Sequence, residues 1–173
     1  MPDNQPALSP DFVVTFRSLM LDGILREVPK TKRVIELVPD DRSDYRPDPK
    51  SRTARDLAWH LASTDVLFMD GIANLTFETE WNTEAPKTTG EIAAWYEDNI
   101  QRAAERVRAM SPEQLLTAVN FFGAFNLPSA LYLNFLNNHS IHHRGQLATY
   151  LRPMGSKVPD IYGGSADEEW KAA

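Results

Sequence analysis

The sequence predicts an all-α protein that folds as a four-helix bundle with a short C-terminal extension. Four long stretches carry apolar residues at the three- and four-residue spacing of an amphipathic helix. Helix-start signals precede these stretches, and no segment shows the sustained alternation of apolar and polar residues that marks a half-buried strand. Because 173 residues with 42% hydrophobic content can bury one core, we expect residues 1–173 to form a single helical domain.

The first helix is expected over residues 9–38. Ser9 is a favourable N-cap, and Pro10 suits the first helical position because the N–H that a proline lacks has no partner there. Pro29 should kink or divide this helix, although apolar residues renew the helical pattern after it. The stretch from Asp40 to Lys50 contains two prolines and is expected to be a loop.

Capping signals also mark the second and third helices, which are expected over residues 53–73 and 89–110. Thr53 and Thr88 stand at their starts, and each is followed three residues later by an acidic residue. This is the spacing of a capping box, in which the two side chains bond to each other's backbone N–H groups.

The fourth helix is expected over residues 128–151. Pro153 and Gly155 follow it and should end it. Residues 111–114 repeat a start signal and predict a short helical turn, whereas the aromatic connector 121–127 fits no element clearly.

Composition excludes several classes of function. The net charge of -6 provides no basic face for a nucleic acid, so we expect no nucleic-acid partner. No run of 18 apolar residues could span a membrane, and residues 1–10 lack the basic and apolar parts of a signal peptide. We therefore expect no membrane association and a cytoplasmic location. The absence of cysteine removes disulfides, thiolate metal ligands and cysteine nucleophiles.

Three of the four histidines predict a metal site. His139 and His143 stand four residues apart, so their rings project from one helix face with an offset of roughly 40° and a rise of about 6 Å. His60 lies on the inward stripe of the second helix, where it could meet this pair. Such a tri-histidine site holds one divalent ion and leaves a coordination position open. The alternative is that these residues are hydrogen-bonded core histidines, because single histidines on apolar faces often are.

The neighbours of this pair have separate expected roles. His142 points about 100° away from His143 and is expected to form a hydrogen bond at a helix or subunit interface. Gln146 should orient a bound water or ligand, or else satisfy a buried group. Arg144 is expected to form a structural ion pair, and Gly145 to let another helix approach closely.

Other metal and catalytic centres do not match the sequence. The histidines lack the Glu-x-x-His spacing of a di-iron bundle, and the sequence contains no His-Glu-x-x-His, no phosphate-binding glycine loop and no Gly-x-Ser-x-Gly. The histidine motifs contain no carboxylate that could act as a general acid or base, which weakens the case for a hydrolase. The nearby polar candidates are His142, Gln146 and Tyr162, and Trp59, Trp81 and Trp95 could line a pocket.

The chain resembles the DinB/YfiT-like family of four-helix-bundle metalloproteins. The resemblance rests on residues 45–47, 56–61, 139–146 and 158–163, which occur in the expected order over most of the chain. It implies a DinB-like bundle and a homodimer that binds one divalent metal ion, zinc or nickel, through His60, His139 and His143.

The resemblance also suggests a function without assigning catalytic residues. Some members of the family are transferases or isomerases that use low-molecular-weight thiols. The chain is therefore expected to be a divalent-metal-binding protein, and as an enzyme it would be a metal-dependent thiol S-transferase acting on small electrophiles. The alternative is a non-catalytic metal-binding stress or structural protein.

Overall fold

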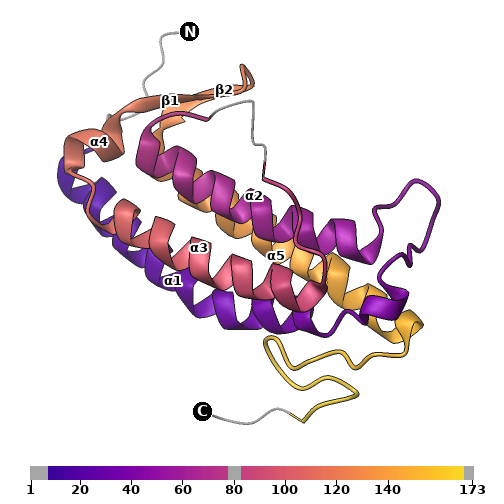
Figure 1. Cartoon of the computed structure of the whole chain (residues 1–173). Coiled ribbons are helices and arrows are strands. Elements are labelled where there is room, and N and C mark those ends of the chain that lie inside the picture. Colours follow the sequence, from indigo (N-terminus) through magenta and orange to yellow (C-terminus); the bar gives the residue numbers. More distant parts are fainter. Residues whose placement is uncertain (1–7, 78–82, 170–173) are drawn as a thin grey trace, which may run out of the picture.

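Four long helices dominate the computed structural model, which describes residues 8–77 and 83–169 (Figure 1). They are α1 (Pro10–Glu36), α2 (Ala54–Asn74), α3 (Thr89–Arg108) and α5 (Tyr132–Leu151). A short helix α4 (Pro112–Leu116) precedes a hairpin of β1 (Ala118–Phe121) and β2 (Phe125–Pro128), and 3-10 turns occupy Asp40–Arg42, Ser129–Leu131 and Arg152–Met154. Among the described residues, none of the helices could span a membrane, given their length and apolar content.

The four long helices pack side by side around an apolar core. α2 contacts α3 and α5, and α1 contacts the same two helices from the other side. Fully buried side chains come from all four helices, among them Leu21, Leu61, Ile100 and Leu136. The prediction of an all-α four-helix bundle is confirmed. After α5, residues 155–169 run without a helix along one end of the bundle (Figure 1).

The first helix begins as predicted but is not divided. The Ser9 hydroxyl accepts a hydrogen bond from the backbone N–H of Phe12, and Pro10 opens the helix. Pro29 lies inside α1, which continues without interruption to Glu36, so of the two outcomes expected for this proline, division of the helix does not occur. The ring is exposed, and the buried residues around it hold the helix together despite the lost hydrogen bond.

The predicted caps are present at the other helix starts. At α2 the Thr53 hydroxyl accepts from the backbone N–H of Asp56 at 3.0 Å. Thr88 and Glu91 form a complete capping box at α3, and Ser111 begins a second box at α4. The fourth long helix starts at Tyr132 and not at residue 128, because the first residues of the expected segment form the end of β2 and a 3-10 turn.

The connector 121–127 belongs to a β-hairpin that the sequence did not predict. β1 and β2 are antiparallel, and Phe121 pairs with Phe125 across the turn. The turn uses left-handed backbone at Phe122 and Gly123, with φ of 49° and 79°. The side chain of Asn120 fastens it by accepting from the Gly123 N–H at 2.7 Å. Strands of four residues are too short to show a reliable alternation.

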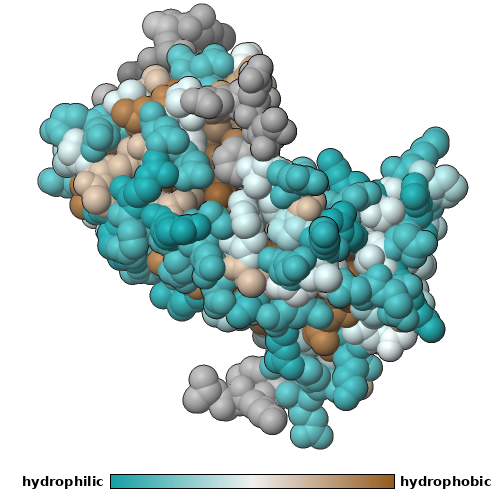
Figure 2. Space-filling view, viewed as in Figure 1, coloured by the Kyte–Doolittle hydropathy of each residue, from teal (hydrophilic) through white to brown (hydrophobic). Residues whose placement is uncertain are grey.

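Aromatic rings close the hairpin end of the bundle. Phe68 of α2 stacks on Phe121 of the hairpin at a centroid distance of 5.3 Å, and Phe77 packs edge-on against both rings. Phe77 reaches this position because Gly71 of α2 has no side chain, and a Cβ there would lie closer than 3.0 Å to the Phe77 ring. Figure 2 shows a mostly hydrophilic face, with hydrophobic surface visible toward the end that carries α4 and the hairpin.

Candidate metal centre

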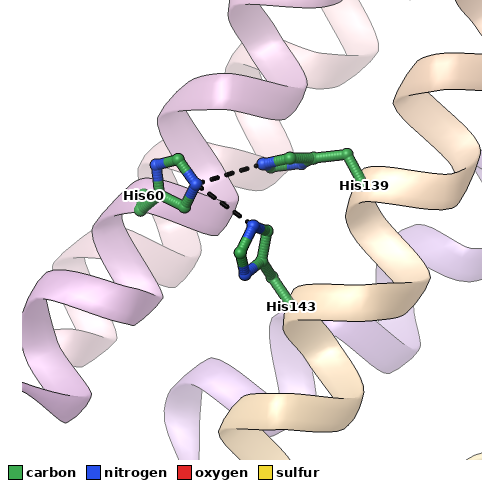
Figure 3. A group of neighbouring side chains, drawn as sticks. All are labelled: His60, His139 and His143. Atoms are coloured by element: carbon green, nitrogen blue, oxygen red, sulfur yellow. Dashed lines mark hydrogen bonds between the residues drawn. The ribbon is translucent and has the colours of Figure 1, made fainter. Parts of the chain in front are cut away.

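The structure brings His60 of α2 together with His139 and His143 of α5 (Figure 3). The Nε2 atom of His60 lies 3.2 Å from Nε2 of His143 and 3.3 Å from Nε2 of His139. One ligand atom from each of the three rings lies within 4.8 Å of the other two, and all three residues are half-buried. Two neighbouring helices therefore present three imidazole nitrogens to one point in space.

These separations suit a metal ion. An ion bound to two imidazole nitrogens at about 2.0–2.1 Å each, with tetrahedral angles, places the nitrogens roughly 3.3–3.4 Å apart. The separations of His60 Nε2 from its two partners are close to this value. Among the described residues the group contains these three histidines and no carboxylate as a fourth member. The protein thus supplies three ligands, as in catalytic zinc sites, where the fourth coordination position stays open for water or substrate.

Asp65 of α2 orients His139. Its carboxylate accepts from Nδ1 of His139 at 2.9 Å, and the Asp65 side chain is 2% exposed. An acceptor at Nδ1 fixes the proton there and leaves the lone pair on Nε2, which is how metal-binding histidines are commonly held. Asp65 was not among the predicted site residues. As an acidic residue four positions after Leu61 it falls on the apolar stripe of its helix, which is a detectable anomaly.

The other two histidines are held in the same way. Nδ1 of His60 lies 3.2 Å from the Thr64 hydroxyl, and Nδ1 of His143 lies 3.0 Å from the side-chain oxygen of Gln146. Two roles were expected for Gln146, and the structure supports the second, in which its side chain forms a hydrogen bond with another side chain, here that of His143. Each ring therefore has a partner at Nδ1 and directs Nε2 toward the other rings.

The surroundings of His60 and His143 favour uncharged imidazoles. Burial is the main cause that lowers the pKa of His60 from 6.5 to about 3, and the positive charges of Arg52 and the neighbouring histidines add to it. Burial also lowers the pKa of His143. Burial raises the pKa of the Asp65 carboxyl above its ordinary value, and the hydrogen bond from His139 opposes that shift. Neutral rings are the form that donates to a metal.

The remaining residues of the motif lie outside this group. His142 is exposed, and its ring neighbours that of His143 without joining the three. Arg144 forms the expected ion pair, with Glu27 at 2.5 Å. The expectation for Gly145 is wrong within this chain, because a Cβ there would meet nothing within 4 Å.

The aromatic residues that were expected near the site lie in different places. Trp59 and Trp95 pack on each other at a centroid distance of 4.7 Å, and Trp81 lies outside the described residues. Tyr162 hydrogen-bonds to Glu27 of α1 and Arg144 of α5 and not to the three histidines. Phe68, whose ring centroid lies 6.0 Å from that of His139, is the aromatic neighbour on the hairpin side of the centre.

Comparison with known proteins supports the resemblance found in the sequence. The chain is 28% identical over 149 residues to the uncharacterized protein YrdA of Bacillus subtilis, covering 83% of this chain and 86% of YrdA. The crystal structure of a DinB-like protein from Bacillus cereus, 26% identical, matches with a TM-score of 0.70 over 83% of this chain and 95% of that one. The DinB-like protein YjoA of Bacillus subtilis, 21% identical in the structural match, has the same fold with a TM-score of 0.70, over 83% of this chain and 97% of that one. The sequence profile of the DinB family matches residues 13–172, and the chain therefore belongs to the DinB family.

Proposed function

We propose that the protein binds one divalent metal ion through His60, His139 and His143. The observation that carries this proposal is the convergence of three Nε2 atoms whose rings are each held from Nδ1. Three lone pairs directed at one point repel one another unless a proton or a cation lies between them. An ion there would relieve this repulsion and would favour the charged form of the buried Asp65 carboxyl. Zinc and nickel are the ions we propose, because imidazole suits both and the family resemblance implies them.

Calorimetric titration of zinc and nickel into metal-stripped protein tests the site. His60→Ala, His139→Ala and His143→Ala should each weaken binding severely, because each removes one of three ligands. His142→Ala is the matched control on the same helix turn and should bind like the wild type. Loss of binding in His142→Ala together with normal binding in His60→Ala would refute the ligand assignment.

We further propose that the protein is a thiol S-transferase that acts on small electrophiles and uses the bound ion in catalysis. The group has three protein ligands among the described residues, and its members are half-buried, so a small molecule could reach the open position from solvent. A divalent ion at such a position lowers the pKa of a thiol and so favours the nucleophilic thiolate. The chain itself supplies no thiol, which fits a cosubstrate of low molecular weight.

Cobalt substitution separates this proposal from a non-catalytic metal protein. A low-molecular-weight thiol should produce a sulfur-to-metal charge-transfer band with the cobalt-loaded protein and none with the His60→Ala variant. If the loaded protein shows no spectral change with several thiols, the metal has a structural or sensing role and the transferase proposal fails.

A further inference from the structure

A line of buried polar side chains runs from His139 through the interior of the bundle. It comprises Asp65, Tyr96, Thr31 and Arg144, and each of these residues as a whole is no more than 1% exposed. They come from α2, α3, α1 and α5 in turn, so each long helix contributes one residue. Buried polar groups are costly unless they are paired, and four in one connected line need an explanation.

The first part of the line surrounds the Asp65 carboxylate. Besides the bond from His139 Nδ1, it accepts a hydrogen bond from the Tyr96 hydroxyl at 3.3 Å. The Ser140 side chain also hydrogen-bonds to the carboxylate. Hydrogen bonds from such donors oppose the rise in pKa that burial causes. They favour the charged carboxylate, which accepts the stronger hydrogen bond from Nδ1 of the histidine.

The second part connects Tyr96 to a buried cation. The Thr31 side chain lies near the Tyr96 hydroxyl and lowers its pKa, against the stronger effect of burial, which raises it. Nη1 of Arg144 donates to the Thr31 hydroxyl oxygen at 3.0 Å. Arginine has no acceptor, so the Thr31 oxygen must accept from it, and the Thr31 proton is then free for Tyr96. Arg144 thus occupies the acceptor of Thr31 at one end of the line, and the Tyr96 hydroxyl donates to Asp65 at the other.

The outer end of the line is fixed at the surface. Arg144 pairs with Glu27 of α1 at 2.5 Å, and Tyr162 of the C-terminal segment contacts both residues. The charge of Arg144 is thereby balanced locally, and its guanidinium is held in the orientation that reaches Thr31.

We propose that Tyr96, Thr31 and Arg144 are positioning residues of the histidine centre, which act through Asp65 to keep the proton of His139 on Nδ1 and its Nε2 lone pair on the ion. This inference rests on the proposed metal-binding function. Partners beyond the ligand shell typically change metal affinity by about 10–100-fold, so the contribution is measurable. The competing explanation is that the line only stabilises the packing of the four helices.

A double-mutant cycle on zinc affinity tests the inference, with a competing chelator used to measure the dissociation constant at pH 7. Asp65→Asn should weaken zinc binding about tenfold. Tyr96→Phe and Thr31→Val, which keep shape and remove one hydroxyl, should each weaken it several-fold. In the Asp65→Asn background Tyr96→Phe should have little further effect, because its action passes through the carboxylate.

Tyr150→Phe is the matched control. The Tyr150 hydroxyl is also buried on α5 but has no hydrogen-bond partner within the described parts of the chain, so its removal should leave zinc affinity unchanged. The melting temperature of each metal-free variant is measured alongside, because a purely structural role would lower that temperature and leave affinity unaltered.

The outcomes separate the inference from the function on which it rests. If the wild type binds zinc and Tyr96→Phe and Thr31→Val bind it equally well, the inference is wrong and the metal site stands. An equal effect of Tyr96→Phe in both backgrounds would also overturn it, because the hydroxyl would then act independently of Asp65. If the wild type binds neither zinc nor nickel, the proposed function fails and the inference fails with it.

Discussion

His60 couples the stability of the metal-free protein to pH. Its pKa is about 3 in the folded protein, whereas an unfolded chain has the ordinary value near 6.5. Between these values the unfolded state binds a proton that the folded state does not, so stability should fall as pH is lowered from 6.5 toward 3. Urea unfolding at several pH values measures this decline.

His60→Gln is the control for that experiment, because glutamine does not titrate. The raised pKa of Asp65 acts in the opposite direction at low pH, so the difference between wild type and variant isolates the histidine. The variant should lose less stability over the same pH range. Parallel curves would show that His60 is not buried as a neutral ring.

The histidine site also shows how far single residues can be predicted. The i, i+4 spacing of His139 and His143 is local geometry, and the apolar stripe around His60 indicates an inward position. Asp65 was not predicted because its partner lies 74 residues away on another helix. A long-range hydrogen bond leaves no periodic signal, and only the anomaly of a charge on an apolar stripe marks it.

The contact between α2 and Phe77, which lies three residues beyond the end of that helix, depends on the missing side chain of Gly71. Gly71→Ala should destabilise the protein by about 1–3 kcal/mol, because the new methyl group overlaps the Phe77 ring and forces it from the aromatic cluster. Gly23→Ala in α1 is the matched control: a Cβ there meets nothing within 4 Å, and alanine should stabilise the helix by about 0.5–1 kcal/mol. Urea unfolding of both variants checks the opposite signs, and a stabilised Gly71→Ala would contradict the packing.

Helices were predictable at the element scale because their caps and apolar stripes are local features. Ser9, Thr53 and Thr88 mark starts that the structure reproduces within one residue. The hairpin was not predictable, because its aromatic residues fit any apolar connector and its pairing is decided by contact with Phe68 and Phe77. That Pro29 does not divide α1 has a related reason: tertiary packing outweighs the local cost of one lost hydrogen bond.

At the scale of the whole molecule, the homodimer implied by the family resemblance remains a prediction. Phe12 and Leu19 stand seven residues apart on α1 and are 48% and 70% exposed, which makes this face the interface that we expect. Light scattering at tens of micromolar should give twice the chain mass of 19.6 kDa. Leu19→Glu should shift the protein toward the monomer, and a monomeric wild type would contradict the prediction.

The placement of the histidines has a consequence for how the chain unfolds. His60 and His139 are separated by 79 positions, so an ion shared between them would close a loop that contains α3, α4 and the hairpin. A covalent link over a loop of this length reduces the entropy of the unfolded chain by an amount worth about 4–5 kcal/mol. A metal that dissociates on unfolding contributes less, about 2.7 kcal/mol at a hundredfold excess over its dissociation constant. Chelation should therefore lower the midpoint of urea unfolding, while His139→Ala should be insensitive to chelator. In a chain without cysteine, the ion would act as a reversible cross-link between the two halves of the sequence.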